Sequence, residues 1–370
     1  MPDSNSHPVN KKGFGRTLRE DLRRGDFGRT MHRDYRELKE FFLDDERKAR
    51  LKEMKSIRRA LYTFGWLLKA LFMKLTPARR LLLLLAFIMV LAPHNYQYSG
   101  EYVRISVETS ILAVFIILFV LMLELKDKLL AHDELAEGRA VQTALMPEQS
   151  PEIPGWSVWL FTRTANEVGG DLVDLQALDA NRYRVSLADV AGKGLKAALF
   201  TAKLQATLRA LAPDVLTMSE LAAKLNRIFY RDSLRNFFAS LVCIELKADD
   251  GTVCMLNAGH LPPILITGSS IKETRKGDPA IGIFPDATYS EQRLKLELGE
   301  IFLVYSDGLT DAKNEQGEFF GQQRLMDLLP RVSHLNAQEI GNMIVANVDR
   351  FTGDARVYDD LSMAVIKRNS

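Results

Sequence analysis

The chain has 370 residues, of which 47% are hydrophobic and 26% are charged, a composition typical of a globular protein. Its two cysteines, Cys243 and Cys254, form no CxxC pattern, which excludes a disulfide framework and argues against a zinc site. The net charge of +2 conceals an asymmetry, because residues 1–80 contain 21 Lys and Arg against 11 Asp and Glu, and the remaining chain is acidic. This asymmetry favours contact of the basic part with a membrane surface or another polyanion.

The N-terminal region, residues 1–78, is predicted to be a basic cytoplasmic helical region. It begins without the apolar core of a secretory signal. Residues 16–60 are dense in Arg, Lys and Glu, which is typical of a solvated helix and leaves contact with anionic lipid as the alternative. In residues 61–75 apolar side chains recur at helical spacing, so an interfacial helix is expected there.

Residues 79–125 contain the most apolar segments and predict a transmembrane helical hairpin. The second segment, residues 107–125, has no charged residue between Glu108 and Glu124 and approaches the length of about 20 residues that spans a bilayer. The first segment, residues 79–93, is shorter, and a re-entrant or core helix is the alternative for it. Basic residues flank both segments on one side, which places both termini in the cytoplasm.

A linker helix is predicted over residues 126–150, where it would carry a signal towards the next domain. Leu121 and Leu125 begin a loose apolar stripe, and a helix of this kind can pair with its copy in a homodimer. The heptads are too irregular to predict a coiled coil. Pro and turn residues in 147–155 then mark a domain boundary.

Residues 151–370 are predicted to form one α+β domain, because strands outnumber helices and occur in successive groups. Helical patterns cover residues 195–211, 218–234 and 337–351. Sheet layers faced by helices are therefore expected. Strand patterns cover residues 156–165, 182–190, 239–246, 252–259, 262–268, 291–298, 300–308 and 361–368.

Aspartates recur at strand ends or beside glycine in this domain, and they are the candidate catalytic and metal-binding residues. Each aspartate alone fits an ordinary turn, but carboxylates that converge on one sheet edge are what Mg²⁺ or Mn²⁺ needs. Two such ions about 4 Å apart can activate water for attack on phosphorus, and glycine lets the backbone approach them. The aspartates are Asp171, which follows Gly169 and Gly170, and Asp189, Asp307, Asp359 and Asp360.

The GGD tripeptide that ends at Asp171 also occurs in nucleotide cyclases of the GGDEF kind. That family has Glu and Phe after the aspartate, whereas this chain has Leu172 and Val173. A cyclase would also need a metal-binding aspartate upstream, and here the other candidates lie downstream. The cyclase interpretation is therefore disfavoured.

Five ordered stretches resemble one known family. The first, AVQTALMPEQSPEIPGWSVWLFTRTANEVGGDLVDL, resembles its opening, in which a helix leads to IPG, a strand and VGGD. Across about residues 138–368 the chain is similar to the SpoIIE-type bacterial branch of the PPM family of metal-dependent Ser/Thr protein phosphatases. The other stretches are SLADVAGKGLKAALFTAKLQATLRAL, LNAGHLPPILI, LVYSDGLTDAKNEQGEFFG and YDDLSMAVI.

The resemblance implies a PPM phosphatase-like β-sandwich flanked by helices, with two Mn(II) or Mg(II) ions. Asp189 matches the aspartate that bridges both ions, and Val190 matches the adjacent backbone carbonyl. Asp171 matches the GGD aspartate, and Asp307 and Asp359 match the later ligands. Asp189 and Asp171 are the expected catalytic residues, acting through metal-bound water. The residues expected to support the ligands are Asp360, Gly170 and Lys193.

Two positions depart from the family's patterns. Lys193 stands where this branch often has His, and it either contacts substrate phosphate or is solvated. Ala191 stands where eukaryotic relatives have a histidine acid, so water or another group would protonate the leaving serine oxygen. His260 is a candidate for that role, but a histidine that holds a turn between strands is the favoured interpretation.

The resulting prediction is a membrane-anchored, metal-dependent protein phosphatase in the bacterial inner (cytoplasmic) membrane. The resemblance implies a substrate that carries phosphoserine or phosphothreonine, such as an anti-sigma-factor antagonist, and no nucleic-acid partner is expected. A signal from the membrane or from dimerisation would reach the helix of residues 195–211. The alternatives are a catalytically weak module that binds a phosphoprotein at the membrane, and a structural membrane adaptor, which leaves the aspartates unexplained.

Overall fold

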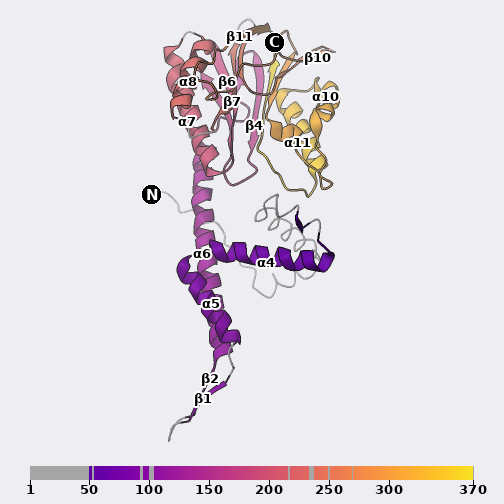
Figure 1. The fold of residues 1–370 in the computed structure, drawn as a ribbon. Helices are drawn as coiled ribbons and strands as arrows, with labels where there is room; N and C mark the ends of the chain where they lie inside the picture. The colour runs from indigo at the N-terminus through magenta and orange to yellow at the C-terminus, as the bar shows by residue number, and fades with distance from the viewer. Residues whose placement is uncertain are drawn as a thin grey trace, which may run out of the picture. The chain divides into compact units, whose positions relative to one another are not determined.

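The computed structural model describes most of the chain beyond residue 49, and the chain divides into two compact units, residues 1–128 and 129–370 (Figure 1). The prediction for residues 1–49 and part of the connection between the apolar segments lie outside the described residues. The described ranges are residues 50–51, 54–91, 95–99, 104–215, 217–232, 237–248, 251–268 and 270–369.

The first unit is built from helices and one small hairpin. Its elements are α4 (Ser56–Lys74), α5 (Pro77–Leu91), β1 (Asn95–Ser99), β2 (Arg104–Glu108) and the first part of α6 (Thr109–Ala144). The Arg79 guanidinium joins α5 to α6 through ion pairs with Glu124 at 2.7 Å and Asp127 at 2.6 Å. The small residues Ala86 and Ala113 of the same helices are fully buried. Arg79 is therefore a residue through which α5 and α6 are joined.

The predicted transmembrane hairpin over residues 79–125 is not supported, because no helix in the described part of the chain is long and apolar enough to cross a membrane. α5 has 15 residues, or about 22 Å of helix, against a bilayer core of about 30 Å. The next residues expected to lengthen the first span form β1, which pairs with β2. In α6 the apolar run ends at Glu124, and Lys126 and Asp127 follow.

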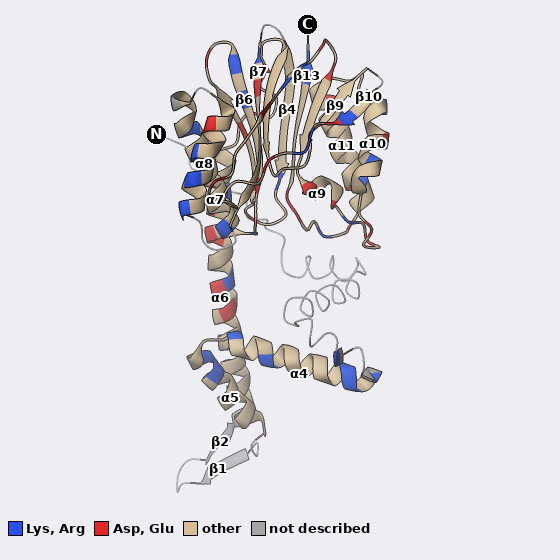
Figure 2. Ribbon diagram, turned by 45° about the horizontal axis from the view of Figure 1, so that its top comes forward, with Lys and Arg blue, Asp and Glu red and all other residues tan. Residues whose placement is uncertain are grey.

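The helices of the first unit expose many apolar side chains. Leu61 and Phe64 of α4 are 67% and 66% exposed, and Phe87 of α5 and Phe115 of α6 are both 62% exposed. Figure 2 shows that α5 carries no charged residue beyond its basic start. An apolar surface of this kind is typical of a region that contacts another molecule.

The second unit is a sandwich of two antiparallel sheets with helices on both outer faces (Figure 1), which confirms the predicted α+β architecture. The first sheet has the order β10 (Ser270–Glu273), β9 (Ile264–Thr267), β12 (Ile301–Tyr305), β13 (Leu361–Arg368), β4 (Trp156–Arg163), β3 (Glu152–Ile153). The second has the order β11 (Glu291–Lys295), β8 (Thr252–Ala258), β7 (Ala239–Lys247), β6 (Arg182–Val190), β5 (Asp171–Ala177). The helical segments are α7 (Leu195–Leu211), the 3₁₀ turn η1 (Ala212–Asp214), α8 (Met218–Asp232), α9 (Asp307–Thr310), α10 (Gly321–Val332) and α11 (Ala337–Thr352).

Side-chain alternation along the strands divides the core into three layers. Val158 and Leu160 of β4 pack between the sheets together with Val185 of β6. Trp159, which stands between them in the sequence, packs instead with α10 and α11. A third cluster lies between the second sheet and the helices α7 and α8. One strand can serve two layers because successive side chains point to opposite faces.

The helix α11 lies very close to the first sheet. A Cβ atom placed on Gly341 would stand 2.0 Å from the Trp159 ring, so only glycine permits this approach. The start of α11 is fixed by a capping box, in which Asn336 and Glu339 each bond to the other's backbone N–H. The first sheet, whose strands β12 and β13 adjoin Asp307 and Asp359, is thus held closely against α11.

Candidate active site

Two of the predicted aspartates face each other on neighbouring strands. β5 and β6 pair so that Asp171 stands opposite Asp189. Asp171 is 5% exposed, and within the described residues its Oδ2 atom has no hydrogen-bond partner. Burial and the negative charge of Asp189 raise the pKa of Asp171 well above its usual range. A buried carboxylate oxygen without a partner is costly to a fold, so this pair is the starting point of the candidate site.

The neighbouring strands β12 and β13 bring further carboxylates to the site. Asp307 begins α9 directly after β12, and Asp359 and Asp360 precede β13. Burial, and then the charges of Asp307, Asp359 and Asp360, raise the pKa of Asp189 to about 6. Burial and the charge of Asp359 likewise raise the pKa of Asp307. The structure therefore brings Asp189 within electrostatic reach of the other predicted aspartates, where the carboxylates repel one another.

The acidic cluster is open rather than a closed cage. Among the described residues, no three acidic, histidine or cysteine side chains approach closely enough to form a ready-made set of metal ligands. Val190 follows Asp189 at the end of β6, and its carbonyl oxygen would stand 3.1 Å from a Cβ atom on Gly170. Gly170 therefore keeps the space between the GGD loop and the end of β6 free of side-chain atoms.

Asp360 holds the GGD loop through backbone hydrogen bonds. Its Oδ2 atom accepts from the N–H groups of Gly170 at 2.6 Å and Asp171 at 3.4 Å. Its Oδ1 atom accepts from the N–H of Ala165 at 2.7 Å. A Cβ atom on Gly169 would stand 2.5 Å from Oδ2 of Asp360, so the first glycine of the motif makes room for this carboxylate. Both oxygens of Asp360 thus serve to position Asp171.

Two polar residues that the sequence analysis did not single out also hold this loop. The side-chain amide of Gln142, in α6, donates to the carbonyl of Gly169 at 2.9 Å and accepts from its N–H at 3.1 Å. The hydroxyl of Thr201, in α7, donates to the carbonyl of Gly170 at 2.5 Å. No sequence signal marked them, because their partners are backbone groups far along the chain.

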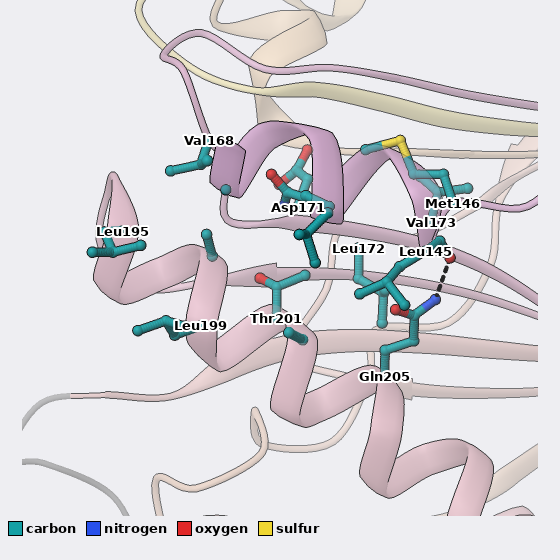
Figure 3. A pocket seen from close by; sticks show the side chains of 15 residues that line it. Leu145, Met146, Val168, Asp171, Leu172, Val173, Leu195, Leu199, Thr201 and Gln205 are labelled. Carbon is teal, nitrogen blue, oxygen red and sulfur yellow. Dashed lines mark hydrogen bonds between the residues drawn. The ribbon is translucent and has the colours of Figure 1, made fainter. Parts of the chain in front are cut away.

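An apolar cavity of about 210 Å³ lies beside these tethers, between α6, β5 and α7. Figure 3 shows Leu195, Leu199, Thr201 and Gln205 of α7 along one side, with Asp171 on the opposite side. The Gln205 amide donates to the carbonyl of Leu145 at 2.9 Å, the bond drawn in the figure. The GGD loop thus adjoins a space that is not filled by side chains.

Lys193 lies at the edge of the acidic cluster. Its ammonium group donates to the carbonyl of Tyr358 at 2.6 Å and forms an ion pair with Asp359 at 3.1 Å. Lys193 precedes Gly194, which has φ +71° and is the N-cap of α7. The lysine is therefore engaged with one of the predicted metal ligands and is not simply solvated.

His260 is buried and holds the turn after β8. Burial lowers its pKa to about 4, so the ring is neutral near pH 7. Its Nε2 atom lies 3.2 Å from the carbonyl of Tyr305 and must donate to it, and its Nδ1 atom then accepts from the Ser240 hydroxyl at 2.8 Å. Asn257 accepts from the backbone N–H of His260 at 2.9 Å. Both ring nitrogens are occupied, so His260 is not placed to protonate a leaving group.

The domain that carries this cluster matches a protein family. The family model described as Stage II sporulation protein E (SpoIIE) matches residues 179–369, just over half of the chain. The match contains Asp189, Asp307 and Asp359, whereas the GGD motif lies before it. The place of Asp171 in the site therefore rests on its pairing with Asp189.

Two curated relatives are similar to about two thirds of this chain at low identity. Protein IcfG of Synechocystis sp. is 26% identical over 265 residues, in an alignment that covers 64% of this chain and 42% of that protein. Phosphoserine phosphatase RsbU of Bacillus subtilis is 23% identical over 237 residues, which is 64% of this chain and 70% of RsbU. The chain thus spans less than half the length of IcfG.

Solved structures show the same fold. The SiaA-PP2C domain of Pseudomonas aeruginosa has a TM-score of 0.58 at 19% identity, over 66% of this chain and 99% of that domain. The RsbU and RsbW domains of Rv1364c from Mycobacterium tuberculosis have a TM-score of 0.52 at 23% identity, over 59% and 61% of the two chains. With the family match, the fold and the acidic cluster lead to one assignment: the chain belongs to the SpoIIE family of PP2C-type bacterial serine phosphatases.

Proposed function

We propose that this chain is a metal-dependent protein phosphatase that hydrolyses a phosphoserine or phosphothreonine on a regulatory protein. The observation that carries the proposal is the facing pair of Asp171 and Asp189, in which a buried carboxylate oxygen has no hydrogen-bond partner among the described residues. Membership of the SpoIIE family and the likeness to a relative named phosphoserine phosphatase support it.

We infer that two Mn(II) or Mg(II) ions bind at this open set of oxygen donors. The carboxylates of Asp171, Asp189, Asp307 and Asp359 and the carbonyl of Val190 would hold them, and hard divalent cations prefer oxygen ligands of this kind. Positive charge beside these carboxylates would lower the raised pKa values of Asp189 and Asp307. It would also interact with the Asp171 oxygen that has no hydrogen-bond partner among the described residues. When bound, such ions supply an activated water and stabilise the charge that develops on the phosphate.

The chain's own residues position the metal-binding carboxylates rather than exchange protons with the substrate. Asp360 fixes the backbone on which Asp171 stands. Ala191 offers no acid, and both nitrogens of His260 are occupied. We therefore assign the proton of the leaving serine oxygen to solvent, which reaches the half-exposed side of the site at Asp359.

The substrate is proposed to be a phosphorylated regulatory protein, such as an anti-sigma-factor antagonist, as the family resemblance implies. A homodimer formed through α6 is part of the same proposal. Leu121, Leu125 and Leu129 of that helix are each more than half exposed and recur every fourth residue, a spacing that suits helix pairing.

Localisation at the bacterial inner membrane is a separate proposal, and it rests on the exposed apolar side chains of α4, α5 and α6. Flotation of the full chain with vesicles of phosphatidylglycerol and phosphatidylethanolamine tests it. Retention of the protein at the bottom of the gradient would rule the lipid contact out.

The test of the enzymatic proposal is phosphate release by the full chain from a phosphoserine peptide and from p-nitrophenyl phosphate. Release that depends on Mn²⁺ and stops with chelator is expected. Binding of the phosphopeptide without release would instead favour a catalytically weak phosphoprotein-binding module.

A further inference from the structure

One ammonium group acts on three of the clustered carboxylates. Lys193 pairs directly with Asp359 at 3.1 Å, although both side chains are about half exposed. Its positive charge also opposes the rise in the pKa of Asp189 and of Asp307. Lys193 thus lies where a bound cation would interact with the same carboxylates, and it competes with such a cation for at least Asp359.

The backbone around Lys193 fixes this placement. Gly192 has φ +118° and Gly194 has φ +71°, conformations that side-chain-bearing residues rarely adopt. Lys193 is therefore presented between two glycine hinges rather than on the regular helix that follows. Its other hydrogen bond, to the carbonyl of Tyr358 at 2.6 Å, draws it towards Asp359.

The same lysine lines a groove of about 640 Å³ in the second unit. Arg139 of α6 and the 164–168 loop also line this groove. Arg139 is 3.8 Å from Glu167, a loose ion pair. Lys193 therefore stands between an open groove and the acidic cluster, where a phosphorylated side chain that entered the groove would meet it.

We propose that Lys193 binds the phosphate group of the substrate, and that its ion pair with Asp359 is the resting position it leaves when a divalent cation binds that carboxylate. The inference rests on the proposed phosphatase function. Lysine is a mobile point charge that suits phosphate oxygens. Exposed lysine–carboxylate pairs contribute little to stability, so the change of partner is inexpensive.

This exchange predicts opposite effects on two ligands, which a purely structural lysine would not produce. Removing the ammonium group frees Asp359 for the metal, so Mn²⁺ binds more tightly. The same change removes a charged hydrogen-bond donor to phosphate, so phosphate binds more weakly.

The experiment uses the full chain and three variants: Lys193→Met, Lys193→Arg and, as the matched control in the first turn of α7, the exposed Lys196→Met. Free Mn²⁺ is measured by electron paramagnetic resonance, and inorganic phosphate is the second probe, as an inhibitor of p-nitrophenyl phosphate hydrolysis. We expect Lys193→Met to bind Mn²⁺ about threefold more tightly and phosphate about tenfold more weakly. Lys193→Arg should recover phosphate binding, and Lys196→Met should match the wild type.

Two results would overturn the inference alone: an active wild type whose phosphate affinity is unchanged by Lys193→Met, or a shift of both affinities in the same direction. A wild-type protein that binds Mn²⁺ but hydrolyses no phosphate ester would overturn the proposed function itself, and this inference with it.

Discussion

The two helical layers of the sandwich are built differently. α10 and α11 bury their apolar side chains on the first sheet, and Gly341 brings α11 directly against Trp159. On the second sheet α7 leaves Leu195 and Leu199 51% and 62% exposed and borders a cavity (Figure 3). α11 thus packs directly on its sheet, whereas α7 leaves free space between itself and the GGD loop.

The two layers therefore depend on different interactions. Side-chain packing holds the fold on the first sheet, and hydrogen bonds hold the candidate site on the second. Dense packing fixes the first layer. On the looser side, the loop that carries Asp171 is positioned by polar tethers from Gln142 and Thr201. Changes in the first layer should therefore alter stability, while changes to the tethers and carboxylates should alter activity.

The largest expected effect is on activity. Asp189→Asn should reduce metal-dependent hydrolysis of p-nitrophenyl phosphate by more than about a hundredfold, because it removes the carboxylate that faces Asp171 and interacts electrostatically with Asp307, Asp359 and Asp360. Circular dichroism should show an unchanged fold. Asp286→Asn, which lies outside the cluster, is the control, and equal activity of the two variants would contradict the assignment.

Alanine substitutions of two glycines should have opposite effects on stability. Gly341→Ala forces a methyl group into the Trp159 ring and should cost about 1–3 kcal/mol of unfolding free energy. Gly138→Ala, in α6, meets only Val168 at 3.7 Å and should stabilise by about 1 kcal/mol. Urea unfolding measures both. A neutral Gly341→Ala would show that the first layer is not tightly packed.

Removing one hydrogen bond to the GGD loop should lower activity, with a smaller loss of stability than Gly341→Ala. Thr201→Val deletes the hydrogen bond to the Gly170 carbonyl, which should cost about 1 kcal/mol and lower hydrolysis about tenfold. Thr207→Val is the matched control, because its hydroxyl donates to the carbonyl of Lys203 within the same helix. Identical kinetics for the two variants would show that the Thr201 hydroxyl does not position the GGD loop for hydrolysis.

The smallest effect is a pH dependence of stability in metal-free protein. The pKa of Asp189 rises from 3.8 to about 6 on folding, so its contribution to stability is complete below about pH 4 and is lost as pH rises through 6. His260, with its pKa lowered to about 4, has the opposite slope and loses stability as pH falls below 6.5.

Comparing the pH dependence of stability in the wild type and in Asp189→Asn isolates the contribution of Asp189, because both proteins keep His260. The melting temperature of the wild type minus that of the variant should fall between pH 4 and pH 7. A constant difference across this range would show that Asp189 titrates normally in the fold.

Much of the fold follows from local patterns in the sequence. The helix predicted over residues 195–211 is α7, because its apolar periodicity and flanking glycine are local signals. α10 was not predicted, since Pro330 lies inside it and reads as a helix breaker. β5 was also missed, because Asp171 and Asp174 interrupt its apolar pattern.

The site was only partly predictable for a different reason. The aspartates could be found because carboxylates at strand ends have a chemical meaning. Gln142 and Thr201 could not, because they bind backbone atoms of residues 27 and 31 positions away. The transmembrane hairpin was expected from composition alone, but the residues needed to lengthen its first helix form β1 instead.

The most direct test of the central claim is the number of Mn²⁺ ions bound per chain, measured by electron paramagnetic resonance on the wild type, Asp189→Asn and Gly341→Ala. We predict two ions for the wild type and for folded Gly341→Ala, and fewer for Asp189→Asn. The same stoichiometry in Asp189→Asn as in the wild type would contradict the assignment of this acidic cluster as the metal site.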